Sequence, residues 1–292
     1  MRRYALIFGI ILVVALPFSR AEETSTSQDP LEILRRSLPN WYRSLDVARD
    51  YTFQQRSVRT QFKNEDGDVL KTGSVTYQIS IIYGETYAKL IARNDEPLSE
   101  KDQKKEDRKL DKFFEKQKNI SEEERLRNRQ KERDIFQREF ADELLEALDW
   151  RVVGEEDIDG HPVWMFNATP KRDYRSNTRF GKLLSKVTGK LWITKADYHW
   201  VKAEADLIDN VTIGWFLLKL RKGAHLEFER TRVNDEVWLP KRASDESVGR
   251  VLGIPIRIRN TAEYRNYQKF MSDVKIIVTT DTIMATQEDP QQ

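Results

Sequence analysis

The chain of 292 residues contains no cysteine. Disulfide bonds, thiol nucleophiles and cysteine metal ligands are therefore excluded, and so is a lipid attached to a cysteine at an export cleavage site. Histidine is scarce as well, and the three present (His161, His199 and His225) fall on separate predicted strands. We interpret these histidines as solvent-facing or structural, and we expect no metal site and no cofactor.

A large excess of charge of one sign is also missing, because the net charge is +2. The protein therefore has no strong positive electrostatic field that would favour binding of nucleic acid. The sequence has no glycine-rich phosphate loop, nucleophile elbow or zinc-protease helix motif. Carboxylates are plentiful, but Glu227 and Glu229 alternate with Leu226 and Phe228 as outward-facing strand residues do. Since a catalytic carboxylate needs a pocket that shifts its pKa, we predict that the protein is not an enzyme.

Long apolar runs are rare, and one occurs at residues 5–18, behind two arginines and followed by small residues up to Ala21. The run is shorter than the roughly 20 apolar residues that span a bilayer as a helix. This pattern predicts a signal peptide at residues 1–21, cleaved near Ala21. The alternative is an uncleaved N-terminal anchor. In either case we expect an exported protein.

Two amphipathic helical patterns follow. From Leu31, apolar residues at spacings of four, three and four predict a helix with one buried face, interrupted or kinked at Pro39. Its face is formed by Leu34, Leu38, Trp41 and Leu45. Residues 100–143 contain 28 charged residues, 14 of each sign, and predict solvent-facing helices with a break at 119–121. The C-terminal part of this insertion presents an apolar face that contains Phe136, Phe140 and Leu144.

The rest of the chain alternates as antiparallel strands do. Residues 51–62, 72–83 and 86–93 predict a meander of hairpins, and strands resume at Trp150 after the helical insertion. Residues 171–184 are interpreted as a basic, polar connector, and residues 189–270 predict about five more strands. We expect one antiparallel sheet of roughly ten strands. The apolar, basic-flanked cluster at residues 214–223 is interpreted either as a buried connector or as a docking segment for an anionic membrane or a partner.

Aromatic side chains recur along the predicted strands, where they either fill an ordinary core or line a groove for an apolar ligand. A curved sheet with one helix-covered face suits an acyl chain, because each buried CH₂ contributes about 0.8 kcal/mol. The candidate ligand-binding residues are Phe53, Tyr77, Ile79, Trp164, Phe166 and Trp192 on the strands, with Phe136, Phe140 and Leu144 on the helical lid.

The pattern at residues 189–197, GKLWITKAD, together with the segments at 222–229, 237–240 and 264–270, resembles the outer-membrane lipoprotein-sorting (LolA/LolB/RseB-like) family. The resemblance implies an α+β fold. Its core would be a strongly curved antiparallel sheet, an incomplete β-barrel, with an N-terminal helix and the inserted helices covering the concave face. It also implies a single domain at residues 22–285, with the charged insertion at 99–148 and a disordered tail at 286–292.

The same resemblance implies a function. A member of this family would be a monomeric periplasmic carrier that holds a lipid or the acyl chains of a lipoprotein between sheet and lid, with transient membrane contact. The alternative is an RseB-like envelope sensor or adaptor that binds an inner- or outer-membrane protein, which the charged insertion favours. The family has an arginine that holds the helical lid closed, and we assign it to no residue of this chain.

Overall fold

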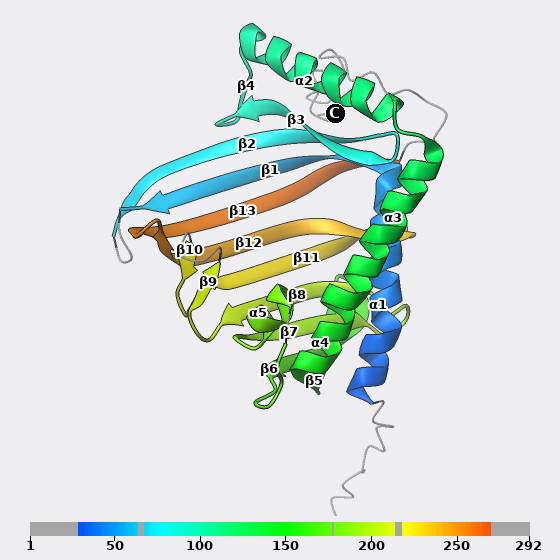
Figure 1. Ribbon diagram of the computed structural model, residues 1–292, viewed down its shortest axis with the longest axis vertical. Coiled ribbons are helices and arrows are strands. Elements are labelled where there is room, and N and C mark those ends of the chain that lie inside the picture. The colour runs from blue at the N-terminus through cyan, green and yellow to red at the C-terminus, as the bar shows by residue number, and fades with distance from the viewer. Residues whose placement is uncertain (1–28, 64–66, 177, 214–217, 270–292) are drawn as a thin grey trace, which may run out of the picture.

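The computed structural model describes residues 29–63, 67–176, 178–213 and 218–269, which form an antiparallel sheet with helices against it (Figure 1). The predicted signal peptide at 1–21 and the predicted tail at 286–292 lie outside the described residues. So do residues 214–217 of the apolar cluster.

The first helix, α1 (Pro30–Val47), begins where the sequence pattern predicts. The Asp29 side chain accepts a hydrogen bond from the backbone N–H of Leu31, and a proline at the first helical position has a φ suited to a helix. Pro39 does not end the helix, which runs on for eight residues beyond it. Leu45, which was predicted on the buried face, is exposed. The buried residues of α1 are Ile33, Leu34, Ser37, Leu38 and Ser44.

A short 3₁₀ turn, Ala48–Asp50, leads into the predicted meander of strands. The meander is formed by β1 (Tyr51–Phe62), β2 (Val69–Ile82), β3 (Glu85–Arg93) and the two-residue β4 (Glu96–Pro97). A turn at Tyr83 and Gly84, both with positive φ, joins β2 to β3. The predicted hairpins are confirmed.

The charged insertion is helical and breaks where predicted. It consists of α2 (Glu100–Lys118), α3 (Glu122–Phe136), a π turn (Gln137–Ala141) and α4 (Asp142–Ala147). Ser99 and Ser121 cap α2 and α3, each accepting a backbone N–H three residues on, which explains the break at 119–121. The helix α3 buries none of its described residues.

The strands that follow the insertion outnumber the prediction, and the described part of the chain contains thirteen strands in all. The connector, predicted without a helix, contains the short α5 (Arg179–Leu184). The later strands are β5 (Leu148–Ile158), β6 (His161–Pro170), β7 (Val187–Thr194), β8 (Trp200–Leu207), β9 (Val211–Ile213), β10 (Leu218–Leu220), β11 (His225–Val233), β12 (Val237–Val251) and β13 (Ile254–Lys269).

The strand order across the sheet is β4-β3-β2-β1-β13-β12-β11-β8-β7-β6-β5, with β10 and β9 attached beside β12. Every registered pair is antiparallel. Among the described strands β4 and β5 do not pair, so the sheet stays open. The predicted class, a curved, incomplete antiparallel barrel with helices against it, is confirmed. The strand β13 lies between β1 and β12 and joins the two groups of strands.

The helices do not all cover the same part of the sheet. Helices α1 and α4 pack on β5 to β8 and enclose the main apolar core. By contrast, α2 lies along the β3 edge (Figure 1), where Phe113 packs against Tyr87 and Asp107 pairs with Lys89. The first inserted helix therefore covers the edge of the sheet and not the apolar face beneath α1.

Candidate functional site: the helix-covered face of the sheet

One face of the sheet can be followed from strand to strand through the register, because directly paired residues share a face. The row that runs from the helix-covered core to the meander consists of Phe166, Leu191, Ala203, Phe228, Ala243, Ala262, Ser57 and Val75. This is the face that α1 and α4 cover at its β5–β8 end.

At the covered end the face is filled by side chains. Phe166 and Leu34 are completely buried, and Leu144 is nearly so. Phe140 stacks between Phe136 and Phe180, with ring centroids 5.0 and 5.1 Å away. Five predicted ligand residues are thus brought together here as part of a packed core: Trp164, Phe166, Phe136, Phe140 and Leu144.

The middle of the same face carries small side chains. Ala203, Ala243, Ala262 and Ser57 follow one another across β8, β12, β13 and β1, interrupted by Phe228. All four are half-buried. These small residues form a row across the strands, which we call the small-residue lane.

The lane is bordered by larger rings on the side of the strand ends near α1. Phe53 lies on this face with Tyr264 and Tyr267, at ring distances of 6.1 and 5.1 Å. Burial raises the pKa of both tyrosine hydroxyls, so both stay neutral at physiological pH. Of the predicted ligand residues, Phe53, Tyr77 and Ile79 share this border.

Trp192 alone among the predicted ligand residues lies on the opposite face. Its neighbours in the strand, Leu191 and Ile193, belong to the core beneath α1, whereas Trp192 packs with Val163 and Trp238 in a second cluster. Adjacent residues of a strand point to opposite faces of the sheet, so Trp192 points away from the face of Leu191 and Ile193.

A buried arginine lies beside the lane and was missed at the sequence level. Arg230 is 4% exposed, and its guanidinium lies 4.9 Å from the Trp41 ring of α1. It donates to the backbone carbonyls of Trp200 and Trp238, while its Nε has no partner. No carboxylate pairs with it in the described part of the chain. Burial lowers the pKa of Arg230 to about 10, so the side chain is still charged at neutral pH.

The sequence did carry a signal for this residue. In the strand HLEFERTRV, Arg230 falls two positions after the inward-facing Phe228, so simple alternation places a cation on the covered face.

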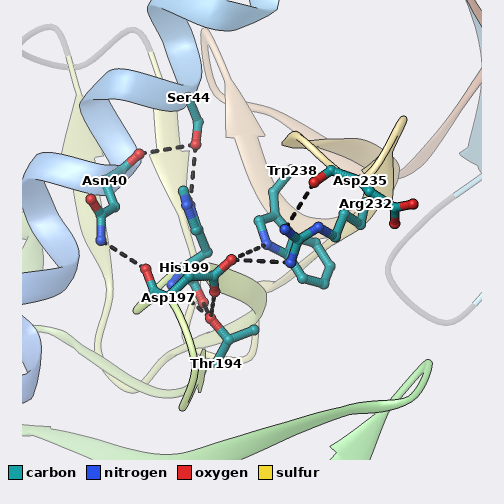
Figure 2. Close-up of polar contacts among 8 residues, drawn as sticks. All are labelled: Asn40, Ser44, Thr194, Asp197, His199, Arg232, Asp235 and Trp238. Carbon is teal, nitrogen blue, oxygen red and sulfur yellow. Dashed lines mark hydrogen bonds and ion pairs between the residues drawn. The ribbon is translucent and has the colours of Figure 1, made fainter.

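A polar cluster attaches α1 to the turn between β7 and β8 (Figure 2). Asn40 donates through its amide nitrogen to the Asp197 carbonyl at 2.8 Å. Ser44 lies 3.3 Å from Nδ1 of His199 and donates to the Asn40 carbonyl. The Thr194 hydroxyl donates to the Asp197 carboxylate and accepts the His199 backbone N–H.

Asp197 also connects this turn to the neighbouring hairpin. Its carboxylate accepts from Arg232 at 3.2 Å and from the Trp238 indole at 3.4 Å (Figure 2). Burial lowers the pKa of His199 below its ordinary value, although the Asp197 charge opposes that change. The imidazole is therefore neutral at physiological pH, and protonation would place a second positive charge close to Arg232.

A second polar cluster ties α4 to the connector after β6. The buried Glu143 carboxylate accepts hydrogen bonds from the hydroxyls of Tyr174, Ser176 and Thr178 at 2.5, 2.7 and 2.6 Å. Burial alone would raise the pKa of Glu143, but the three donors outweigh it and the pKa is lowered. Burial and the neighbouring Glu143 raise the pKa of Tyr174 to about 12. A Cβ at Gly181 would lie 1.9 Å from this carboxylate, so only glycine fits there.

Among the described residues, no group of three histidine, aspartate or glutamate side chains is arranged to hold a metal ion. His225 pairs with Asp206 at 2.8 Å, and Glu227 pairs with Lys202 at 3.4 Å. None of the helices in the described ranges is both long and apolar enough to cross a membrane.

No family model matches the sequence, and no curated protein matches it. Solved structures do match. A DUF1329 family protein from Desulfovibrio piger matches at 11% identity and a TM-score of 0.33, covering 87% of this chain and 99% of that one. A LolA superfamily protein from Nitrosomonas europaea matches at 12% identity and 0.32, covering 88% and 100%.

A putative outer membrane lipoprotein-sorting protein domain from Vibrio parahaemolyticus matches at 9% identity and a TM-score of 0.31, covering 87% and 97%. Two of these three solved structures belong to the group that the sequence resemblance named, and at these identities the similarity concerns the fold alone.

Proposed function

We propose that the protein is an exported, periplasmic carrier that binds the acyl chain of a lipid or lipoprotein without covalent chemistry. On this proposal it is not an enzyme, needs no cofactor, and takes up and releases its ligand by movement of α1 and α4 against the sheet.

The small-residue lane is the observation that carries this proposal. Ala203, Ala243 and Ala262 lie half-buried on the face that α1 and α4 cover elsewhere, bordered by Phe53 and Tyr264. An acyl chain laid along the lane would remove apolar surface from water on both sides, at about 0.8 kcal/mol for each CH₂. No directional contact is needed, so ligands of different chain length would fit.

The attachment of α1 supplies a route for opening. Asn40 and Ser44 hold α1 to the β7–β8 turn by hydrogen bonds that water can replace. Moving α1 also lifts Trp41 from Arg230. The guanidinium, with its unpaired Nε, would then be free to bind the carboxylate or phosphate of the incoming ligand.

The proposal is tested by filling the lane. Ala243 and Ala262 are directly paired, and the double variant Ala243→Leu with Ala262→Leu should reduce uptake of a fluorescent fatty acid about tenfold. The neighbouring pair Ser244 and Thr261 lies on the opposite face, so Ser244→Leu with Thr261→Leu is a matched control that should leave uptake unchanged. Mass spectrometry of an organic extract should show a co-purified lipid. The absence of both bound lipid and uptake in the unmodified protein would sink the proposal.

Movement of α1 is tested by a reversible lock. Because the chain has no cysteine, Ser44→Cys with His199→Cys introduces one defined pair. The oxidised protein should fail to take up the fatty acid, and a reductant should restore uptake. Uptake that is unaffected by a verified disulfide would show that α1 does not gate the site.

A second function is favoured by the inserted helices. An envelope adaptor needs an exposed surface for a protein partner, and α3 presents mixed charges with none of its described residues buried. Charge complementarity of this kind contributes mainly to specificity and association rate. Reversing exposed charges, Glu124→Lys with Lys131→Glu, should abolish partner capture and leave fatty-acid uptake intact if the adaptor function is correct.

A further inference from the structure

The strand ends far from α1 form an exposed apolar edge. The β12–β13 hairpin presents Leu252 and Ile254 at 65% and 67% exposure, with Val251 beside them. The tips of β9 and β10 and the β12–β13 turn gather at the same edge of the sheet (Figure 1). We call Val251, Leu252, Ile254, Lys219 and Arg250 the tip surface.

The turn at this tip contains an unusual residue. Leu252 and Gly253 both have positive φ, 49° and 84°. Asparagine, aspartate or glycine is preferred at the first of two such positions, as Asp159 before Gly160 in the β5–β6 turn illustrates, whereas the β2–β3 turn shares the strained arrangement with Tyr83 before Gly84. A left-handed conformation costs a residue with a Cβ about 1–2 kcal/mol. A strained leucine that is also exposed points to a function for the side chain.

Two cations lie beside this leucine. Lys219 of β10 is directly paired with Arg250 of β12, so two like charges face each other across the strands, which is unfavourable unless an anion is shared. Neither side chain has a carboxylate partner among the described residues. Gly249 makes the arrangement feasible, because a Cβ there would lie 2.0 Å from the Lys219 carbonyl oxygen.

The cations line a hollow of a size that suits an anionic head group. The hollow has a volume of about 300 Å³ and is lined by Lys219, Arg250, Leu252 and Gly253. An adjoining hollow of about 320 Å³ shares the same two cations. Apolar tips next to a positively charged hollow match the layered chemistry of a membrane surface, with phosphate above hydrocarbon.

We propose that the tip surface docks the protein on an anionic phospholipid membrane. Leu252 and Ile254 enter the interfacial layer, and Lys219 and Arg250 hold a lipid phosphate between them. The strands β12 and β13 run from this surface to Ala243 and Ala262 in the middle of the small-residue lane. Membrane docking does not depend on what the lane binds.

The test is flotation with vesicles of phosphatidylcholine, with and without phosphatidylglycerol. The full chain should bind the anionic vesicles and lose binding as salt is raised. Lys219→Gln with Arg250→Gln should bind about 30-fold more weakly, since each basic residue near an anionic surface contributes about a factor of five. Leu252→Asn, which suits the turn, should weaken binding without loss of fold. Lys104→Gln with Lys112→Gln on α2 removes the same charge and should change nothing.

Three results would overturn the proposal. The first is equal binding to neutral and anionic vesicles, and the second is full binding by both tip variants. The third is a concentration-dependent dimer that Leu252→Asn abolishes while no vesicle binds, which would assign the surface to a second copy of this chain. Fatty-acid uptake by the tip variants is measured in parallel. Retained uptake with lost flotation separates membrane docking from the acyl-carrier function.

Discussion

The two ends of the strands differ in what covers them. Beneath α1, the large apolar side chain of Phe166 is fully buried, and so is Leu34 of α1 itself. At the tip surface, Leu252 and Ile254 are apolar too, yet they are mostly exposed and are flanked by Lys219 and Arg250. Both ends carry large apolar side chains, and the exposure of these side chains distinguishes the two ends. The first end is a core that holds the helices to the sheet, whereas the second is built for contact with something outside this chain.

The largest effect on the free energy of unfolding is expected at the covered end. Phe166→Ala removes a fully buried ring from the core and should lower the free energy of unfolding by about 3–5 kcal/mol. Urea denaturation measures the change. Leu252→Ala at the tip surface should cost less than about 0.5 kcal/mol. Equal losses at the two sites would show that the tip is part of the core.

The next largest effect on stability is expected for the hydrogen bonds of Glu143, which join α4 to the connector after β6. Glu143→Ala leaves three hydroxyl groups without their acceptor and should cost about 1–3 kcal/mol. Because the pKa of Glu143 is lowered in the folded protein, its contribution is present above the ordinary carboxylate pKa and is lost as the pH falls through the folded value. Glu146→Ala, on the exposed side of the same helix, should have no such effect. Denaturation curves at several pH values distinguish them.

At the tip surface a substitution should raise the free energy of unfolding, whereas the substitutions above lower it. Leu252→Asn replaces a strained leucine by a residue that accepts positive φ, and should stabilise the protein by about 1 kcal/mol. Leu252→Ala should give no gain, since alanine lacks the short polar side chain whose local hydrogen bonds let asparagine adopt a positive φ. A rise in melting temperature for asparagine alone would separate backbone strain from loss of apolar exposure. No rise would remove the argument that the leucine is kept for function.

The smallest expected effect is a pH dependence of the α1 attachment. Burial lowers the pKa of His199, so protonation disfavours the folded state. Stability should therefore be unaffected above the ordinary histidine pKa of about 6.5 and should fall as the pH drops below it. Thermal melts of the unmodified protein and of His199→Asn test this. The variant should lose the slope between pH about 7 and about 5, and an unchanged slope would assign it to other groups.

Much of the fold was predictable because local signals agree with it. The bounds of β1 follow from its strand-like composition and from the turn residues after it, and Ser121 marks the start of α3 through its cap. The six-residue α5 was missed because one and a half turns show no periodicity. Its first turn is fixed by Thr178, which also donates to Glu143 from a distant part of the sequence.

The site was less predictable, because alternation separates two faces without saying which one the helices cover. Trp192 looked equivalent to Phe166 on composition, yet the register places them on opposite faces. Alanines at 243 and 262 give no signal as single residues, since the lane appears only when β12 and β13 pair. Local strain at Leu252 depends on a backbone angle that no residue pattern reveals.

The position of β13 has a consequence for how the chain acquires its structure. The meander β1–β4 and the group β5–β12 touch in the sheet only through this strand, which comes after both in the chain. Pairing β1 with β13 closes a loop of roughly 200 residues, which is entropically costly and slow. We therefore expect two partly formed sheets with unpaired edges to persist until the final strand arrives. During that interval the unpaired strand edges are most exposed to aggregation.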